Sequence, residues 1–296
     1  MDALLERLGA ASAATPVALG RYDVVGSLGA GGMGSVFAGV DRERGTPVAI
    51  KVLRWLDPRA PSRFKAEFRS VAGVRHDNLV PMHELGVEDG AYYLAMERVD
   101  GVDFMTWVRR RQRDGVADPV SVAELPPTGD TTRLGRRVAS PSVKRSARKP
   151  SAPPDLVRLR AALVQLVRGV RALHLHGLLH LDLKPSNVLV TEAGRVVILD
   201  LGLSRATADA GAPGDDGVIA GTPGYMAPEL VVGDPVTEAT DWYAVGCLLY
   251  VALTGVQPTL APPDQPAPVV APHELVPEVP RDLGDLAVAL LSPAPE

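Results

Sequence analysis

The feature that most restricts the fold is a glycine-rich turn at residues 29–34, which joins two strand-like segments. RYDVVGSL precedes the turn and SVFAGVD follows it, and a third alternating segment, TPVAIKVL, comes next. Glycines let backbone amides approach phosphate groups closely, but a dinucleotide-binding fold needs a helix directly after such a turn. Because the following segment is β-like, a strand–glycine–strand hairpin is predicted. The alternative that G-x-G-x-x-G raises, a dinucleotide-dependent oxidoreductase, is disfavoured.

Residues 21–97 contain five predicted strands and one predicted helix. In TPVAIKVL, Lys51 shares a face with two apolar residues, so it needs a partner if that face is covered. The helix begins near Pro61 and places Glu67 at the edge of its apolar face. A strand lysine and a helix carboxylate are therefore candidates for an ion pair.

The remaining segments predict one insert and several helices. Residues 115–154 are rich in Pro, Ser, Thr and Arg and lack periodicity, so we predict a disordered basic insert. A solvated linker, a phosphorylated regulatory segment and a docking arm for an acidic partner all remain open for it. Apolar residues recur at helical spacing over 156–176, which predicts a helix that faces the core. Further helices are predicted after Thr240 and in DLGDLAVALL.

The composition indicates a globular protein and argues against two kinds of partner. The 296 residues are 46% hydrophobic and 22% charged, with a net charge of −4. That charge gives no general attraction for nucleic acid or anionic membrane. The longest apolar stretch, WYAVGCLLYVALTGV, is shorter than the ~20 residues of a membrane span. A single cysteine, Cys247, fits a reducing compartment, and the absence of a secretory signal favours a cytoplasmic location.

Three more motifs lie in the second half of the chain. They are HLDLKPSN at 180–187, DLG at 200–202 and GTPGYMAPE at 221–229. With the glycine turn, Lys51 and Glu67, they form an ordered set that resembles the eukaryotic-type protein kinase family. DLKPSN and GTPGYMAPE are similar to its serine/threonine branch, and LGAGGMGSVF to its bacterial members. Lys184, two residues after Asp182, disfavours tyrosine specificity. The resemblance covers about residues 21–290 apart from the insert.

The resemblance implies an α+β, bilobal protein-kinase fold, with a five-stranded antiparallel N-lobe that carries one main helix and a mostly helical C-lobe. The implied parts are an N-terminal extension at 1–20, the N-lobe and hinge at 21–99, and the C-lobe at 100–296. The disordered insert at about 115–154 lies in the last of these. Family members continue with a helix whose arginine pairs with the carboxylate of Glu229, and no such arginine follows here. We therefore expect a truncated C-lobe and C-terminal domains attached in the full-length protein.

The implied activity is transfer of the γ-phosphate of ATP to Ser and Thr hydroxyls of protein substrates, in signalling. The implied cofactors are ATP and Mg²⁺, with Mn²⁺ as a substitute. By resemblance, Asp182 accepts the proton of the substrate hydroxyl, Lys184 steadies the γ-phosphate, and Thr222 helps to position Asp182 and the acceptor. Asn187 and Asp200 hold the metal.

The resemblance also assigns the nucleotide site and two bracing residues. Lys51 and Glu67 are expected to pair and to hold the α- and β-phosphates. The residues expected to bind ATP are Leu28, Gly29, Gly31, Gly32, Gly34, Val36, Ala49, Lys51, Met96, Glu97, Val99, Asp103 and Leu189. His180 is expected to brace the Asp200 loop, and Asp241 to hold the catalytic loop through backbone amides. For Met96, the hinge backbone, Asp103 and Asp241, a plain packing or surface role is the alternative.

One departure from the family pattern affects the expected regulation, and a second is expected to be tolerated. Most members have an arginine before the catalytic aspartate, where this chain has Leu181, and that arginine normally pairs with a phosphorylated residue. The loop after Asp200 offers only Ser204 and Thr207 as acceptors. We therefore hypothesise that activity does not require activation-loop phosphorylation. The second departure is Leu201 in DLG, which keeps an apolar side chain.

A pseudokinase is the second functional hypothesis, meaning a module that binds nucleotide or acts as a scaffold without transfer. It is supported by Leu181 and by the missing C-terminal helix. The presence of the lysines, carboxylates and asparagine named above argues against it, so an active kinase is the preferred interpretation.

Overall fold

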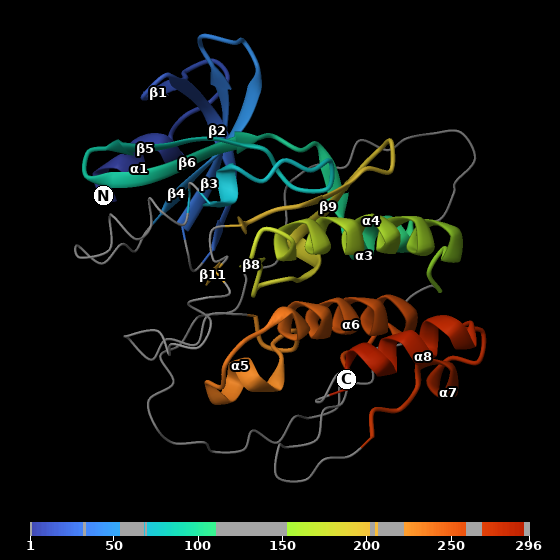
Figure 1. The fold of residues 1–296 in the computed structure, drawn as a ribbon. Helices are drawn as coiled ribbons and strands as arrows, with labels where there is room; N and C mark the ends of the chain where they lie inside the picture. The colour runs from blue at the N-terminus through green and yellow to red at the C-terminus, as the bar shows by residue number, and fades with distance from the viewer. Residues whose placement is uncertain are drawn as a thin grey trace. The chain divides into compact units, whose positions relative to one another are not determined.

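The computed structural model describes residues 2–31, 34–53, 68, 70–110, 153–201, 205–206, 222–258 and 268–292. The chain folds into two compact units (Figure 1). Unit 1 comprises the described residues up to 75 together with 80–100, and unit 2 comprises 76–79 and the described residues from 101 onward. Gly32, Glu67, Ser204, Thr207 and residues 115–152 of the predicted insert lie outside the described residues, although residues 70–72 are helical, as predicted.

Unit 1 is built on an antiparallel sheet with six strands among the described residues. The strands are β1 (Val17–Leu19), β2 (Tyr22–Gly31), β3 (Gly34–Asp41), β4 (Pro47–Leu53), β5 (Met82–Glu88) and β6 (Ala91–Glu97). Their order in the sheet is β1-β2-β3-β4-β6-β5. The prediction of five strands is corrected to six because residues of the expected N-terminal extension form β1, which pairs with β2.

Helix α1 (Asp2–Gly9) belongs to the core of unit 1. Leu4 and Leu8 are 2% and 0% exposed, and they pack in one cluster with buried residues of the sheet. That cluster takes alternate residues of β4, Val48, Ile50 and Val52, all fully buried. Successive strand residues point to opposite faces, so the α1 side of the sheet is the face that Lys51 does not use. The apolar residues of α1 remove this face from water.

Unit 2 is mostly helical. Its helices are α3 (Phe104–Arg109), α4 (Leu156–His174), α5 (Pro228–Val232), α6 (Glu238–Thr254), α7 (Pro272–Leu275) and α8 (Arg281–Leu290), with a 3₁₀ turn, η1 (Pro185–Asn187). Its short strands are β7 (Gly101–Asp103), β8 (Leu178–Leu179), β9 (Val188–Thr191), β10 (Val196–Ile198) and β11 (Arg205–Ala206). Strands β10, β9 and β7 form one sheet, and β11 pairs with β8. The predicted helix at 156–176 is confirmed as α4.

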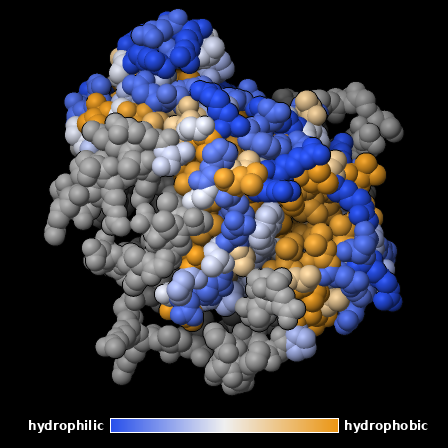
Figure 2. All heavy atoms as spheres, viewed as in Figure 1, coloured by the Kyte–Doolittle hydropathy of each residue, from blue (hydrophilic) through white to orange (hydrophobic). Residues whose placement is uncertain are grey.

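Helix α6 lies at the centre of unit 2, because it is apolar around nearly its whole circumference. Burial raises the pKa of the Cys247 thiol to about 12, which marks this helix as an apolar interior. Among the described residues, no helix is both long enough and apolar enough to cross a membrane. Figure 2 shows apolar side chains gathered where Figure 1 draws α4, α6 and α8. Exposed apolar side chains of these helices include Val157 and Val164 of α4 and Leu286 of α8.

Candidate active site

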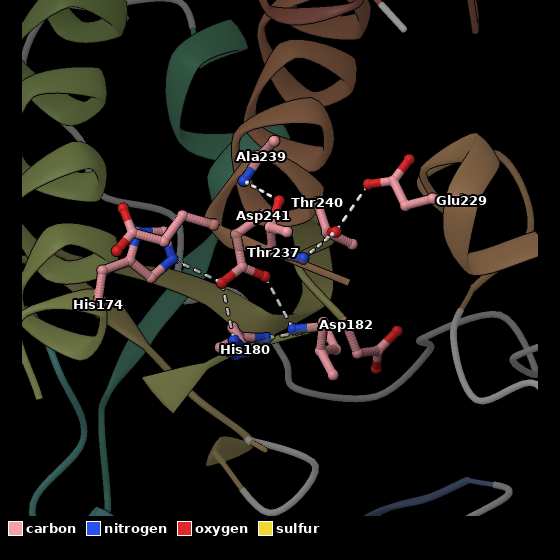
Figure 3. Close-up of polar contacts among 10 residues, drawn as sticks. His174, His180, Asp182, Glu229, Thr237, Ala239, Thr240 and Asp241 are labelled. Carbon is pink, nitrogen blue, oxygen red and sulfur yellow. Dashed lines mark hydrogen bonds and ion pairs between the residues drawn. The ribbon is translucent and has the colours of Figure 1, made fainter. Parts of the chain in front are cut away.

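The catalytic loop, residues 180–187, is held in place by one buried carboxylate on α6. Asp241 is 0% exposed and accepts hydrogen bonds from the backbone N–H groups of His180 and Leu181, both at 2.8 Å. The Nε2 of His174, at the end of α4, donates to the same carboxylate at 2.8 Å (Figure 3). A buried carboxylate needs several donors, and these three supply them. The expectation that Asp241 ties down the loop is confirmed.

His180 links the catalytic loop to the segment that leads to Asp200. Its Nε2 lies 2.8 Å from the carbonyl oxygen of Leu199, and its Nδ1 accepts from the N–H of Asp182 at 3.2 Å. A carbonyl oxygen only accepts, so His180 is the tautomer that carries hydrogen on Nε2. The predicted bracing contact is present.

Asp182 lies at the centre of a polar cluster and is only 4% exposed. Thr222 Oγ1 donates to its Oδ1 at 2.8 Å, and Lys184 Nζ donates to its Oδ2 at 2.7 Å. Lys184 also donates to Thr222 Oγ1 at 2.8 Å, which closes a triangle of three side chains. These contacts fix the carboxylate next to a hydroxyl and a positive charge. Such a carboxylate can accept a proton from a hydroxyl group that binds beside it.

Asn187 and Asp200 carry side-chain oxygen atoms that could bind a metal ion, and their backbone segments are adjacent. The Nδ2 of Asn187 donates to the backbone carbonyl of Asp182 at 2.8 Å and to the Oδ2 of Asp182 at 3.1 Å. The side-chain amide oxygen is therefore the atom that Asn187 could offer a metal. The Leu199 N–H donates to the Asn187 carbonyl at 2.8 Å, directly before Asp200. An amide oxygen and a carboxylate suit Mg²⁺ or Mn²⁺, which prefer hard oxygen ligands. The residues present therefore fit such an ion.

The strand register of unit 1 brings the predicted nucleotide-binding side chains of the sheet onto one face. Val36 lies opposite Lys51 across β3 and β4, and Ala49 lies opposite Met96 across β4 and β6. Since directly paired residues and residues two apart share a face, these four lie on the side opposite α1. Lys51 is 6% exposed, so its ammonium group lies in a covered environment.

The glycine turn between β2 and β3 needs glycine at its far end. Gly34 has a φ of +152°, and a Cβ there would lie 2.1 Å from the carbonyl oxygen of Val52. Gly29 pairs with Val36 and Gly31 with Gly34, while two register irregularities occur farther from the turn, between Val24 and Gly29 of β2. Gly34 therefore keeps the backbone of β3 close to β4, and the absence of a side chain there suits a turn that binds phosphate through amides.

One backbone hydrogen bond limits what the predicted hinge can offer a nucleotide, and Asp103 has a local role. The Glu97 N–H donates to the Pro81 carbonyl at 2.9 Å, so Glu97 can offer an adenine only its carbonyl. Asp103 caps α3, because its Oδ1 accepts from the N–H groups of Met105 and Thr106 at 3.0 Å. Its predicted contact with ribose stays a prediction, as does the contact of Leu189, which pairs with Asp103 across β7 and β9.

Two contacts near the site were not predicted from the sequence. Thr240 Oγ1, on α6, donates to Glu229 Oε1 at 2.7 Å and thereby joins α5 to α6 (Figure 3). Glu229 therefore has a hydrogen-bond partner within unit 2. The second contact is the hydrogen bond from His174 to Asp241. The sequence places His174 only within a predicted helix, and the one feature that could have indicated its role is a polar residue at the end of an apolar stripe.

The protein kinase domain family matches residues 22–125 and 134–273 of this chain. The gap between the two matched ranges falls inside the predicted insert. The kinase domain of PknI from Mycobacterium tuberculosis has a similar solved structure, with a TM-score of 0.61 and 24% identity. That alignment covers 95% of this chain and 91% of the PknI chain. At this identity the likeness shows a shared fold.

Several curated bacterial proteins are similar in sequence. The DNA damage-responsive serine/threonine-protein kinase RqkA of Deinococcus radiodurans is 32% identical over 92% of this chain and 36% of its own length. Serine/threonine-protein kinase PknA of Mycobacterium tuberculosis is 32% identical over 81% of this chain and 48% of its own. A probable serine/threonine-protein kinase PknB of Corynebacterium glutamicum is 29% identical over 80% and 32%. The chain thus spans about a third to a half of the length of these relatives.

Proposed function

Because this chain belongs to the protein kinase domain family, we propose that it transfers the γ-phosphate of ATP to serine and threonine hydroxyls of proteins. The observation that carries the proposal is the triangle of Asp182, Lys184 and Thr222. Asp182 would accept the proton of the attacking hydroxyl, and Lys184 would offset charge on the transferring phosphoryl group. Thr222 would hold the Asp182 carboxylate in the orientation that this step needs.

The proposal includes a divalent cation. When bound, Mg²⁺ or Mn²⁺ supplies charge neutralisation for the phosphate oxygens. Asn187 would hold it through the amide oxygen and Asp200 through its carboxylate. The hydrogen bond between Leu199 and Asn187 supports this pairing, because it keeps the two backbones adjacent.

Unit 1 would bind the nucleotide on the face that carries Lys51. Ala49, Met96, Val36 and Leu28 would contact the adenine, while Glu97 and Val99 would bind its edge through backbone groups. The glycine turn would bind the phosphates through amides, and Lys51, paired with Glu67, would neutralise them. We also propose action in the cytoplasm on protein substrates, with activity that does not require activation-loop phosphorylation.

The test is phosphate transfer from labelled ATP to a generic Ser/Thr protein substrate, with and without Mg²⁺. Asp182→Asn is expected to lower the rate by about 10²–10⁴-fold while ATP binding persists. Asp234→Asn, an exposed carboxylate in the same unit, is the matched control and should keep the wild-type rate. Equal rates for Asp182→Asn and wild type would overturn the proposal. A wild-type chain that binds ATP and transfers nothing would favour the pseudokinase alternative.

A further inference from the structure

Leu181, directly before Asp182, occupies an unusual backbone conformation. Its φ is +63°, in the left-handed region that residues with a Cβ rarely adopt. The N–H of Leu181 is bound by Asp241, and so is the N–H of His180. A strained residue persists only where the surroundings determine its conformation, and Asp241 determines the backbone here. The side chain of Leu181 is therefore aimed in a direction that the buried carboxylate sets.

That side chain packs in a small apolar cluster. Its buried members are Leu179 of β8, at 0% exposure, and Val236, at 6%. Leu181 and Leu230 are partly buried and pack against these two. We call these four residues the Leu181 cluster. It connects the catalytic loop to α5, which carries Leu230, and to the segment between α5 and α6, which carries Val236.

Helix α5 depends on such contacts for its position. It has only five residues, and no side chain caps its N-terminus. A helix this short is not stable alone, so tertiary packing must hold it. Its described attachments are the Leu181 cluster and the hydrogen bond from Thr240 to Glu229. The chain runs from Thr222, which donates to Asp182, into α5 within six residues, so the placement of α5 affects the placement of Thr222.

We propose that Leu181 is a positioning residue that holds α5, and through it the segment from Thr222, against the catalytic loop by apolar contact. The inference rests on the proposed function and concerns how the segment from Thr222 to α5 is held in place. The cluster contains no charged member, so its attraction does not depend on a phosphate or on an ion pair. Leu181 does not touch the reacting groups, and its effect would pass through Leu230 to Thr222. The substrate hydroxyl should therefore be the reactant whose binding suffers when the cluster is broken.

Two substitutions separate the apolar contact from the backbone strain. Leu181→Asn accepts a left-handed φ more readily than leucine but cannot fill the apolar cluster. Leu181→Met keeps an apolar side chain of similar volume. In steady-state assays of the full chain, we expect Leu181→Asn to raise the KM for a peptide substrate by about five- to tenfold. The KM for ATP should stay within about twofold of wild type, and Leu181→Met should restore the wild-type peptide KM.

A second pair of variants keeps the test decisive if Leu181→Asn does not fold. Leu230→Ala removes the α5 side of the cluster and should raise the peptide KM in the same way. Val231→Ala, on the same helix at 49% exposure, should leave it unchanged. A purely structural role would lower the active fraction, and thus kcat, with both KM values unchanged. Phosphatase treatment of wild type is expected to leave the peptide KM unchanged.

The outcomes distinguish this inference from the proposed function. If wild type shows no transfer that depends on Asp182, the proposed function fails and the inference fails with it. If wild type transfers phosphate but Leu181→Asn and Leu230→Ala keep the wild-type peptide KM, only the positioning role is refuted. A rise in peptide KM after phosphatase treatment of wild type would also refute it, because the contact would then depend on a phosphate.

Discussion

Replacing Asp241 with asparagine should weaken the attachment of the catalytic loop to α6. The Asp241 carboxylate accepts from His180 and His174 at Oδ2 and from Leu181 at Oδ1, each at 2.8 Å. An asparagine with its oxygen at the Oδ2 position keeps the first two bonds as neutral ones. Its amino group would then face the Leu181 N–H, so that two donors oppose each other.

The size of the effect follows from these bonds. A hydrogen bond to a charged group contributes about 1.5–3 kcal/mol and one between neutral groups about 1 kcal/mol, so two bonds weaken and one is lost. Loss of the charge removes the desolvation cost of a carboxylate that is 0% exposed, and this offsets part of the change. We expect the free energy of unfolding to fall by about 2–4 kcal/mol, equivalent to a Tm lower by about 5–15 °C.

The prediction is checked by thermal unfolding and by kinase assays of the full chain. Asp241→Asn should lower Tm and also kcat, because Leu181 and with it Asp182 lose their backbone anchor. Asp234→Asn, which neutralises an exposed carboxylate in the same unit, should change neither. If Asp241→Asn kept the wild-type Tm within about 1 °C and the full kcat, the role assigned to the three hydrogen bonds would be refuted.

Three further predictions concern stability and reactivity. Leu8→Ala should lower the free energy of unfolding by about 2–5 kcal/mol because Leu8 is fully buried. Arg7→Ala, which breaks an exposed ion pair, should lower the free energy of unfolding by less than about 1 kcal/mol. Equal effects of Leu8→Ala and Arg7→Ala in denaturant titrations would contradict the burial of α1. Gly169→Ala would place a Cβ 2.7 Å from Ile198 Cδ1. It should therefore lower Tm, although alanine favours helices over glycine, and a raised Tm would disprove the close packing. Cys247, with a pKa of about 12 and 0% exposure, should resist iodoacetamide at pH 8 in the native chain and react rapidly in denaturant. Fast labelling of the native chain would refute the burial of Cys247.

Periodicity and turn chemistry predicted most elements of the fold. The strands around the glycine turn, the helix at 156–176 and the apolar helix after Thr240 were predicted from local patterns, and the structure confirms them. The first twenty residues were predicted as an extension, because α1 is only eight residues long and no local signal says that its leucines meet a sheet. That contact depends on tertiary packing, which periodicity does not encode.

For the candidate site, the sequence predicted the residues that belong to motifs and did not predict the contacts that hold them. The motifs placed Asp182, Lys184 and Thr222 in one site although Thr222 is forty positions from Asp182. No motif predicts the hydrogen bond from Thr240 to Glu229 or the packing of Leu181 and Leu230 against Leu179 and Val236. Such pairs lie far apart in sequence and use ordinary residue types, so only the folded chain shows that they meet.

The position of α1 has a practical consequence for anyone who produces this catalytic region. The family match begins at residue 22, and a recombinant chain that starts there would lack α1 and β1. It would leave Tyr22 and Ile50, both fully buried in the intact unit, open to solvent along an uncovered sheet. Such a truncated product should aggregate or copurify with chaperones, and failure of its activity would say nothing about the chemistry of Asp182.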